Sequence, residues 1–348
     1  MTRQTRQRQA RGAVLTALIG IVSLHLGMGF FAETLRPDLY DPEYGHRLRQ
    51  VRKMPRDMPL VVALGSSRVQ MGLRPKELGV SDVRVYNFGI AGCGPVGQML
   101  MMNRLFAAGV VPDAFVLELL PPVLNMEGPI EGFVKLPRID SRDLPLLMER
   151  SEAPGTLVRG WLGQRLNAWY STRLALVSRT CPGFLPWRDR LDYMWADVDE
   201  TGWLPFPYDV ILDEKRADYI DSALSQYKHH FANFHISPRP RDAIETMLQW
   251  CKERNIPVVM ITMPEGSAFR NAYPADAWPQ IDAFLAEMRD KHGLRVVHCR
   301  DWVPDLEFSD SHHLLKVGAK RFSERFGREV IPLVRDTIMS PVISTSAD

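Results

Sequence analysis

The sequence predicts an α/β fold in three layers, with helices on both faces of a parallel sheet of about five strands. Three observations lead to this prediction. Short apolar runs alternate with amphipathic segments in two blocks, at about 59–125 and 237–336. Between the blocks, residues 126–236 lack this alternation and indicate a helical insertion. Before the first block lies an uncharged stretch long enough for one membrane-spanning helix.

The strands are expected where short apolar runs end at Gly, Pro or Cys, because a strand that is buried on both faces shows no polar alternation. These runs are PLVVALG (59–65), VRVYNFG (83–89), DAFVLELL (113–120), IPVVMITMP (256–264) and LRVVHC (294–299). The helices are expected where apolar residues recur at helical spacing between Pro, Gly or Asn. These segments are 96–109, 238–255, 278–293 and 316–334.

The composition indicates a globular chain rather than a disordered or fibrous one. Of the 348 residues, 45% are hydrophobic and 24% are charged, and the formal net charge is +2, all ordinary values for a folded protein. Four arginines lie in the first eleven residues; with these set aside, 39 basic residues stand against 41 acidic ones. The rest of the chain therefore lacks the general excess of basic residues that nucleic-acid binding favours, and we expect no nucleic-acid partner.

The N-terminus has the pattern of a signal-anchor. A basic tip at 1–11 precedes the uncharged segment Gly12 to Ala32, and about 20 helical residues span a bilayer core. The excess of Arg before this segment predicts a single-pass protein of the inner (cytoplasmic) membrane, with its N-terminus in the cytoplasm and the remainder periplasmic or extracytoplasmic. A cleaved signal peptide is the main alternative, because it shares these features. A buried soluble helix is the other.

The exported part is expected to be one interrupted domain. Residues 33–58 form a stalk or a first surface helix, 59–336 form the α/β domain with its insertion at 126–236, and 337–348 form a C-terminal tail. The insertion holds five of the eight tryptophans: Trp161, Trp169, Trp187, Trp195 and Trp203. We expect them to form the core of a cap; the alternative is an aromatic platform that stacks on sugar rings.

Two short motifs suggest nucleophilic catalysis. Gly65-Ser66-Ser67-Arg68 follows the first predicted strand, and Asp310-Ser311-His312-His313 opens the last predicted helix. Both motifs then lie at the carboxyl edge of the sheet, where open α/β folds place their sites. An Asp three residues before a His can orient the imidazole, which can then take a proton from a Ser hydroxyl. We therefore expect Ser67, His313 and Asp310 to act as nucleophile, base and orienting acid.

Several alternatives remain at these positions. A Ser in a strand-to-helix turn is often only a helix N-cap. Ser66 could replace Ser67 as the nucleophile, and His312 could replace His313 as the base. Arg68 could bind an anionic group of a substrate, or it could pair with a nearby acid.

On these residues, the α/β portion resembles the SGNH (GDSL) hydrolase superfamily, whose sheet is flavodoxin-like. The resemblance implies that Ser67 is the nucleophile and that Asp310 and His313 complete the triad. It implies an oxyanion hole formed by the backbone N–H groups of Ser67 and of Gly92, in Asn87-Phe88-Gly89-Ile90-Ala91-Gly92. The family's third block supplies an Asn donor. Here that block is displaced, and Asn125 is the nearest match.

Gly-Ser-Ser together with an N-terminal anchor is similar to one subgroup of this superfamily. Its members act outside the cytoplasm beside membrane-bound O-acyltransferases, in teichoic-acid D-alanylation and in alginate or cellulose acetylation. The similarity implies a serine esterase or O-acyltransferase that acts on acyl esters, in the first place acetyl esters, of a cell-envelope polysaccharide or polymer. It also implies a membrane-bound O-acyltransferase as a partner, and neither a cofactor nor a metal.

Two other functions stay open. A catalytically inert module that binds polymer or a partner protein would account for the displaced third-block Asn. A dinucleotide-binding oxidoreductase would account for G-x-G-x-x-G at 92–97, with Glu118 in the place of the ribose-binding acid. Such a fingerprint normally follows the first strand of its sheet, whereas this one follows the second predicted strand.

Overall fold

The computed structural model describes residues 3–339. The chain forms two compact units, each made of two segments. The first unit contains Met1–His46 and Val134–Ala196, and the second contains Arg47–Phe133 and Asp197–Asp348. The boundary near residue 46 falls inside helix α3 (Pro42–Arg52).

The second unit is built on a five-stranded parallel sheet with the order β2-β1-β3-β4-β5. In the register, Gly65 pairs with Gly89 and Leu119 pairs with Thr262, so the carboxyl ends of the strands meet at one edge. This sheet confirms the predicted α/β fold. The strands are β1 (Leu60–Gly65), β2 (Arg84–Gly89), β3 (Ala114–Leu119), β4 (Val258–Thr262) and β5 (Arg295–His298).

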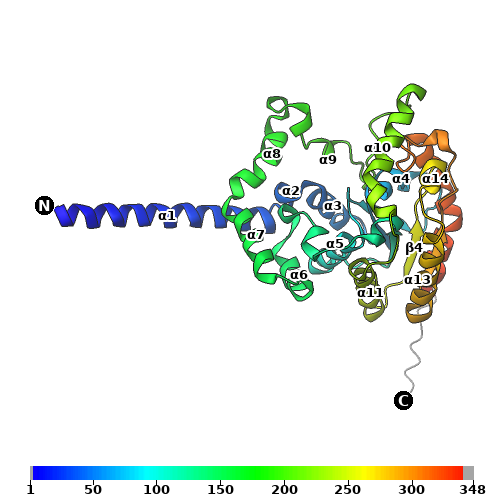
Figure 1. The fold of residues 1–348 in the computed structure, drawn as a ribbon, viewed down its shortest axis with the longest axis horizontal. Helices are drawn as coiled ribbons and strands as arrows, with labels where there is room; N and C mark the ends of the chain where they lie inside the picture. Colours follow the sequence, from blue (N-terminus) through cyan, green and yellow to red (C-terminus); the bar gives the residue numbers. More distant parts are fainter. Residues whose placement is uncertain (1–2, 340–348) are drawn as a thin grey trace, which may run out of the picture. The chain divides into compact units, whose positions relative to one another are not determined.

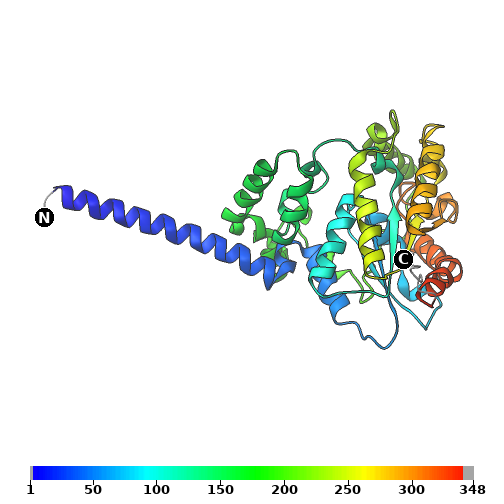
Figure 2. The ribbon, with the colours of Figure 1, turned by 90° about the horizontal axis from the view of Figure 1, so that it is seen from below.

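Helices cover both faces of this sheet. On one face, α5 (Pro95–Ala107) and α11 (Pro238–Glu253) lie side by side (Figures 1 and 2), and α13 (Ala277–His292) packs against α11. On the other face, α14 (Lys316–Glu329) packs against α4 (Ser67–Gly72) and α15 (Ile331–Met339). Every residue of β1 and β3 is buried, as expected for strands covered on both faces.

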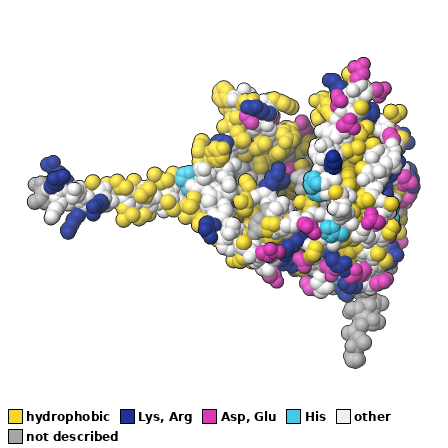
Figure 3. All heavy atoms as spheres, viewed as in Figure 1, with side chains coloured by type: hydrophobic (Ala, Val, Ile, Leu, Met, Phe, Trp, Pro, Cys, Tyr) yellow, Lys and Arg dark blue, Asp and Glu magenta, His cyan; other side chains and the backbone are white. Residues whose placement is uncertain are grey.

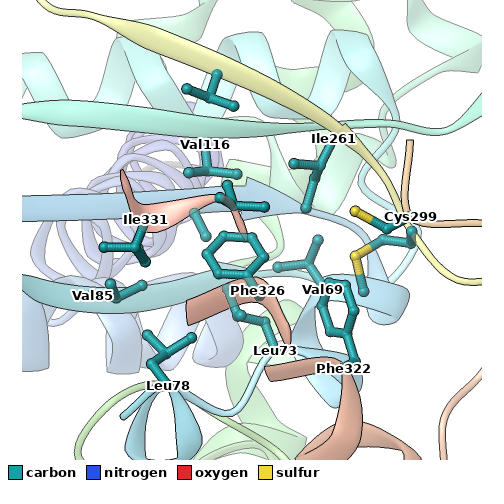
Figure 4. Packing of buried hydrophobic residues seen from close by; sticks show 14 of the residues in the cluster. Val69, Leu73, Leu78, Val85, Val116, Ile261, Cys299, Phe322, Phe326 and Ile331 are labelled. Carbon is teal, nitrogen blue, oxygen red and sulfur yellow. The ribbon is translucent and has the colours of Figure 1, made fainter. Parts of the chain in front are cut away.

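The core beneath α14 and α15 closes the second face of the sheet. Side chains from β1, β2, β3 and β4 meet side chains from α4, α14 and α15 in a continuous apolar cluster (Figure 4). The predicted single helix at 316–334 is interrupted between Glu329 and Ile331. Pro332 explains the break, because proline has no N–H to donate and its ring clashes with the preceding turn. The labelled members of the cluster include Val85, Val116, Ile261, Phe322, Phe326 and Ile331.

The remaining helices of the second unit are short, apart from α10 (Asp213–Phe231). A four-residue helix, α12 (Ser267–Arg270), follows β4. The 3-10 helices of this unit are Pro75–Glu77, Pro121–Asn125, Ile130–Gly132 and Asp305–Glu307.

The described residues of the first unit form helices joined by turns and loops, and none of them lies in a strand. Its α-helices are α1 (Arg3–Thr34), α2 (Pro37–Tyr40), the start of α3, α6 (Leu144–Arg150), α7 (Pro154–Leu166), α8 (Ala168–Thr180) and α9 (Tyr193–Ala196). Its 3-10 helices are Leu136–Arg138, Ser141–Asp143, Pro182–Phe184 and Trp187–Asp189.

Helix α1 is long and apolar enough over Arg3–Ala32 to cross a membrane, by length and composition. Its apolar side chains are exposed; those of Val14, Leu18 and Phe30 are each more than half accessible. Figure 3 shows basic side chains at its N-terminal end and hydrophobic ones along its length. An exposed surface of this kind is expected of a helix whose solvent is lipid rather than water.

Residues 33–58 hold α2 and α3, and both helices have buried side chains. Ion pairs attach them to the 134–196 segment. Asp38 is fully buried and pairs with Arg179 at 3.0 Å, and Asp41 pairs with Arg138 at 3.0 Å. Paired charges of this kind have no local sequence pattern.

The 126–236 insertion is shared between the two units. Residues 134–196 belong to the first, whereas 197–236, including α10, belong to the second. The five tryptophans therefore do not form one cap core. Trp203 packs in the apolar cluster of the sheet, while Trp169 and Trp187 are 56% and 77% exposed. Residues 340–348 of the predicted C-terminal tail lie outside the described residues, and 337–339 are the end of α15.

Candidate active site

A tight turn after β1 presents Ser67. The hydroxyl of Ser66 accepts the backbone N–H of Arg68 at 3.2 Å, so Ser66 is the N-cap of α4 and Ser67 its first residue. Ser66 is 2% exposed, whereas Ser67 is only partly buried. Gly65 is required by close packing, since a Cβ there would lie 2.3 Å from Val69 Cγ2. Ser66 is therefore the cap, and Ser67 carries the accessible hydroxyl.

A short closed loop at 308–314 presents Asp310 and His313. Phe308 and Leu314 form an antiparallel bridge, and the backbone N–H of Ser309 donates to the carbonyl of His313 at 2.9 Å. Ser311 has φ +70°, in the left-handed region, which a non-glycine residue adopts only where its surroundings hold it there. This turn folds the Asp310 carboxylate back toward His313.

The structure brings the three predicted residues into one chain of hydrogen bonds. Ser67 Oγ lies 2.8 Å from His313 Nε2, and His313 Nδ1 lies 2.8 Å from Asp310 Oδ2. The second carboxylate oxygen, Oδ1, accepts the backbone N–H of His313 at 2.8 Å. The side chains of His313 and Asp310 are each 17% exposed. This is the arrangement that a serine nucleophile, a base and an orienting acid require.

The electrostatics keep Asp310 ionised. Burial would by itself raise the pKa of Asp310, but the charge of His313 and its hydrogen bond outweigh burial and hold that pKa well below its usual range. His312 has the opposite surroundings. Its ring is 4% exposed and is stacked on Phe269, with ring centroids 5.2 Å apart, and burial lowers its pKa to about 3. His312 is thus a neutral, buried imidazole, while His313 Nε2 faces the serine.

The buried His312 predicts a loss of stability in acid. The unfolded chain protonates this histidine below about pH 6.5, whereas the folded protein does so only near pH 3. The unfolded state therefore binds more protons between these values, and the free energy of unfolding falls as pH falls through this window. We expect His312→Asn to flatten the decline in Tm between pH 7 and pH 5 by about 5 °C relative to wild type.

Thermal unfolding followed by circular dichroism measures this effect. The matched control is His298→Asn, which removes an exposed imidazole from the end of β5 and should leave the acid slope as it is in wild type. Equal slopes for wild type and His312→Asn would show that the prediction is incorrect.

Two backbone N–H groups lie where an oxyanion hole is expected. Ser67 begins α4, and Gly92 follows β2 with φ +72°, a conformation that favours glycine. Within residues 3–339, neither N–H donates a hydrogen bond to the protein. Asn125 differs, because its amide nitrogen donates to the carbonyls of His230 and Ala232 at 3.0 and 2.9 Å. Both amide N–H groups are used in these bonds, so Asn125 has none left for an oxyanion.

Arg68 is buried beside Ser67 and does not face the solvent. It is 2% exposed, and its guanidinium lies 3.3 Å from Glu265 and 3.8 Å from Glu118. Burial alone would lower its pKa, but the two carboxylates raise it. Of the two roles considered for Arg68, the structure therefore shows pairing with nearby acids.

The donor atoms of Asp310, His312 and His313 lie within 4.8 Å of one another, a spacing that a metal ion could use. The imidazole of His313 already bonds Ser67 through one nitrogen and Asp310 through the other. A metal on this imidazole would have to replace one of those bonds. The geometry therefore favours acid–base chemistry over metal binding for this group.

An aromatic segment lies against His313. The ring centroid of Phe206 lies 6.4 Å from that of His313, and the ring centroid of Tyr208 lies 6.1 Å from that of Phe206. Tyr208 is 54% exposed. An ion pair between Lys316 and Asp209, at 2.7 Å, holds this segment to the start of α14. The sequence alone does not indicate these residues, because no spacing relates 206 to 313.

The glycine-rich turn at 92–97 does not have the surroundings of a dinucleotide fingerprint. This turn follows β2. A dinucleotide fingerprint would instead lie between β1 and β3, where the order in which strands are added to the sheet reverses. Glu118 is 2% exposed, and one of its carboxylate oxygens accepts the backbone N–H of Ser66. It is therefore not free to bind a ribose.

Comparisons with known proteins give weak similarity. A family model matches residues 222–335, about a third of the chain, which contain Asp310 and His313 but not Ser67. None of the curated proteins compared with this chain matches it.

Two solved structures resemble it. A candidate acylhydrolase from Bacteroides fragilis is 10% identical, with a TM-score of 0.40 over 84% of this chain and 95% of its own. A member of a carbohydrate acetylesterase family from Sinorhizobium meliloti is 13% identical, with a TM-score of 0.33 over 81% of this chain and all of its own. With TM-scores below 0.5, neither similarity says what this chain does.

Proposed function

We propose that this protein is an SGNH-like serine acyl-ester enzyme that acts outside the cytoplasm on the acyl esters, in the first place acetyl esters, of a cell-envelope polysaccharide. The observation that carries the proposal is the hydrogen-bonded chain from Ser67 through His313 to Asp310, with distances of 2.8 Å at both steps. Its position at the carboxyl edge of the sheet is the usual one for the site of an open α/β fold.

In the proposed reaction, Ser67 Oγ attacks the ester carbonyl while His313 Nε2 takes its proton. Asp310 holds the other imidazole nitrogen and stabilises the imidazolium that forms. The backbone N–H groups of Ser67 and Gly92 donate to the oxyanion, and each such donor is worth about 3–4 kcal/mol in related sites. His313 then protonates the leaving alcohol, and an acyl-enzyme on Ser67 remains.

The second half of the reaction separates an esterase from a transferase. If water attacks the acyl-enzyme, the product is a free carboxylic acid. If a sugar hydroxyl attacks, the acyl group passes to a new polymer position. For the transferase, a membrane-bound O-acyltransferase is the partner that would supply the acyl group.

Helix α1 supports a location at the membrane. It is long and apolar enough to span a bilayer, and Arg3, Arg6, Arg8 and Arg11 precede its apolar part. Basic residues are retained on the cytoplasmic side. The proposed orientation therefore has the N-terminus in the cytoplasm and the catalytic unit outside it, where envelope polymers are.

The aromatic segment beside His313 supports a carbohydrate substrate. Exposed aromatic rings are costly to leave in water and bind the apolar faces of sugar rings. Tyr208 is more than half exposed and is linked through Phe206 to the catalytic imidazole. A sugar stacked on this segment would hold its ester near Ser67.

This proposal predicts a specific effect of Tyr208→Ala. Loss of one stacking ring, worth about 1.4 kcal/mol, is expected to raise KM for an O-acetylated oligosaccharide about tenfold. The KM for 4-nitrophenyl acetate, which is too small to reach the ring, should change less than about twofold. The assay measures acetate release and nitrophenol release by the full-length protein in detergent.

The control for this prediction is Tyr219→Ala, which removes a partly exposed tyrosine from α10. Equal KM changes for both substrates would contradict the carbohydrate site but leave the esterase standing. A wild-type protein that releases neither product and resists fluorophosphonate would favour the inert binding module. The engaged amide of Asn125, which leaves the third block without a donor, is the observation in favour of that module.

A further inference from the structure

A buried network of charged side chains lies directly behind the nucleophile turn. We call Arg68, Glu118, Glu265 and Arg300 the strand-end network, because they lie at or just beyond the ends of β1, β3, β4 and β5. Arg68 and Glu118 are 2% exposed, and Glu265 is fully buried. Buried ion pairs add little net stability, since desolvation offsets their attraction. Stability alone is therefore a poor reason for such a network beside a catalytic serine.

The network holds both neighbours of Ser67. Glu118 Oε2 accepts the backbone N–H of Ser66 at 2.5 Å. On the other side, Arg68 places its Nε 3.8 Å from Glu118 Oε1. Burial raises the pKa of Glu118, while Arg68 and the Ser66 N–H act against this rise. The peptide that carries the Ser67 nucleophile is thus tied to β3 at each end.

The same arginine connects the turn to the segment after β4. Arg68 Nη2 donates to the carbonyls of Met263 and Pro264 at 3.0 and 3.1 Å, and both terminal nitrogens contact Glu265 Oε1 at 3.3 Å. Glu265 is held in turn by Arg300 at 2.7 Å and by the hydroxyl of Tyr273 at 2.8 Å. This segment cannot move without disturbing Arg68.

The segment after β4 also holds the loop that carries the base. The backbone N–H of Gly266 donates to the carbonyl of Ser311 at 2.7 Å, and the N–H of Phe269 donates to Ser311 Oγ at 3.1 Å. Ser311 is the left-handed residue between Asp310 and His312. A continuous series of contacts therefore joins the nucleophile to the base, although the two are 246 residues apart in sequence.

We infer that Arg68, Glu118 and Glu265 are positioning residues that align Ser67 with His313 without touching the substrate. The inference rests on the proposed function, because alignment matters only if Ser67 is the nucleophile. A misplacement of about 1 Å at a reacting group costs about 100-fold in rate. The effect should fall on kcat rather than on KM, since none of the three side chains faces the solvent.

Two variants of Glu118 test this inference. Glu118→Leu removes the acceptor for the Ser66 N–H and is expected to lower kcat for 4-nitrophenyl acetate about 10- to 100-fold, with KM within about twofold. Glu118→Gln keeps an acceptor oxygen at the same place and should recover most of that loss. The rate of inactivation by a fluorophosphonate should fall and recover in parallel. Tm is measured on each variant.

The control is Asp113→Ala, which removes the acceptor for the backbone N–H of Leu60 at the amino end of β1 and should lower Tm with kcat close to wild type. A wild-type kcat in Glu118→Leu, or kcat losses that follow Tm in all variants, would overturn the inference. If Glu118→Leu does not fold, Arg68→Lys tests the inference instead, because a lysine cannot bond Glu265 and the carbonyls of Met263 and Pro264 at the same time. An unchanged kcat in Arg68→Lys would overturn the inference. A wild-type protein without activity would instead overturn the proposed function.

Discussion

Ser67→Ala is expected to lower kcat/KM for 4-nitrophenyl acetate by about 10⁴-fold or more and to abolish labelling by a fluorophosphonate. The reason is that Ser67 Oγ is the hydroxyl within 2.8 Å of His313 Nε2, and without it no acyl-enzyme can form. In well-characterised serine enzymes, loss of the nucleophile leaves only the contribution of the oxyanion hole and of binding. Labelling and nitrophenol release by the purified full-length protein measure the effect.

Ser66→Ala is the matched control for this variant. It removes the N-cap hydroxyl of α4, which is worth about 1 kcal/mol of stability, and leaves the hydroxyl of Ser67 in place. Labelling should persist in Ser66→Ala. A Ser67→Ala protein that still labels, while Ser66→Ala does not, would make Ser66 the nucleophile.

The same probe tests the location. A membrane-impermeant fluorophosphonate should label wild type on cells whose outer membrane or wall has been removed and whose inner membrane is intact, since the proposed orientation exposes Ser67 outside the cytoplasm. Labelling that requires lysis of the inner membrane would contradict that orientation but not the chemistry.

Asp310→Asn is expected to lower kcat by about 10³- to 10⁴-fold with little change in structure. The asparagine carbonyl can still accept the backbone N–H of His313, which now bonds Asp310 Oδ1 at 2.8 Å. Its NH₂ group would replace Oδ2, which lies 2.8 Å from His313 Nδ1. An NH₂ group cannot accept a hydrogen bond, so the neutral imidazole would carry its proton on Nε2, facing Ser67. In that tautomer Nε2 cannot take the proton of the Ser67 hydroxyl.

The pH profile adds a check on this prediction. His313 holds the pKa of Asp310 well below its usual range, against the opposite effect of burial, so the carboxylate stays ionised at any assay pH from 5 upward. Asp310→Asn should therefore lower kcat by a similar factor across pH 6–9.

The control for Asp310→Asn is Asp305→Asn, an exposed acid that caps the α12 turn through the backbone N–H of Ser267. It should retain kcat within about threefold. If Asp310→Asn also retained kcat, Asp310 would be a loop-capping residue rather than part of a triad.

The sequence alone predicted the sheet and the two motifs because both depend on local patterns. Apolar runs such as 59–65 and 113–120 are strands in the structure, with shifts of a residue at the ends. Asp310 and His313 are three residues apart, so their contact needs only a turn. Ser67 is distant in sequence, but the parallel order of strands brings the ends of β1 and β5 to the same edge.

Contacts between distant polar side chains could not be predicted in this way. From the sequence alone, Arg68 could have faced a substrate. The fold instead places Glu118 of β3 and Glu265, just after β4, beside its guanidinium. Asn125 was the nearest match to a displaced family position, yet its amide is used by two backbone carbonyls near the end of α10. The assignment of 134–196 to the first unit also depends on such pairs, among them that of Arg138 with Asp41.

The sequence by itself determined the anchor-like helix, the alternation of strands and helices and the residue types of the proposed triad, because hydropathy period and short spacing are properties of neighbouring residues. Only the tertiary structure decided which of two serines is exposed, which histidine faces it and what holds them together. The physical reason is that burial and pairing depend on every element that packs around a side chain, and those elements come from far along the chain.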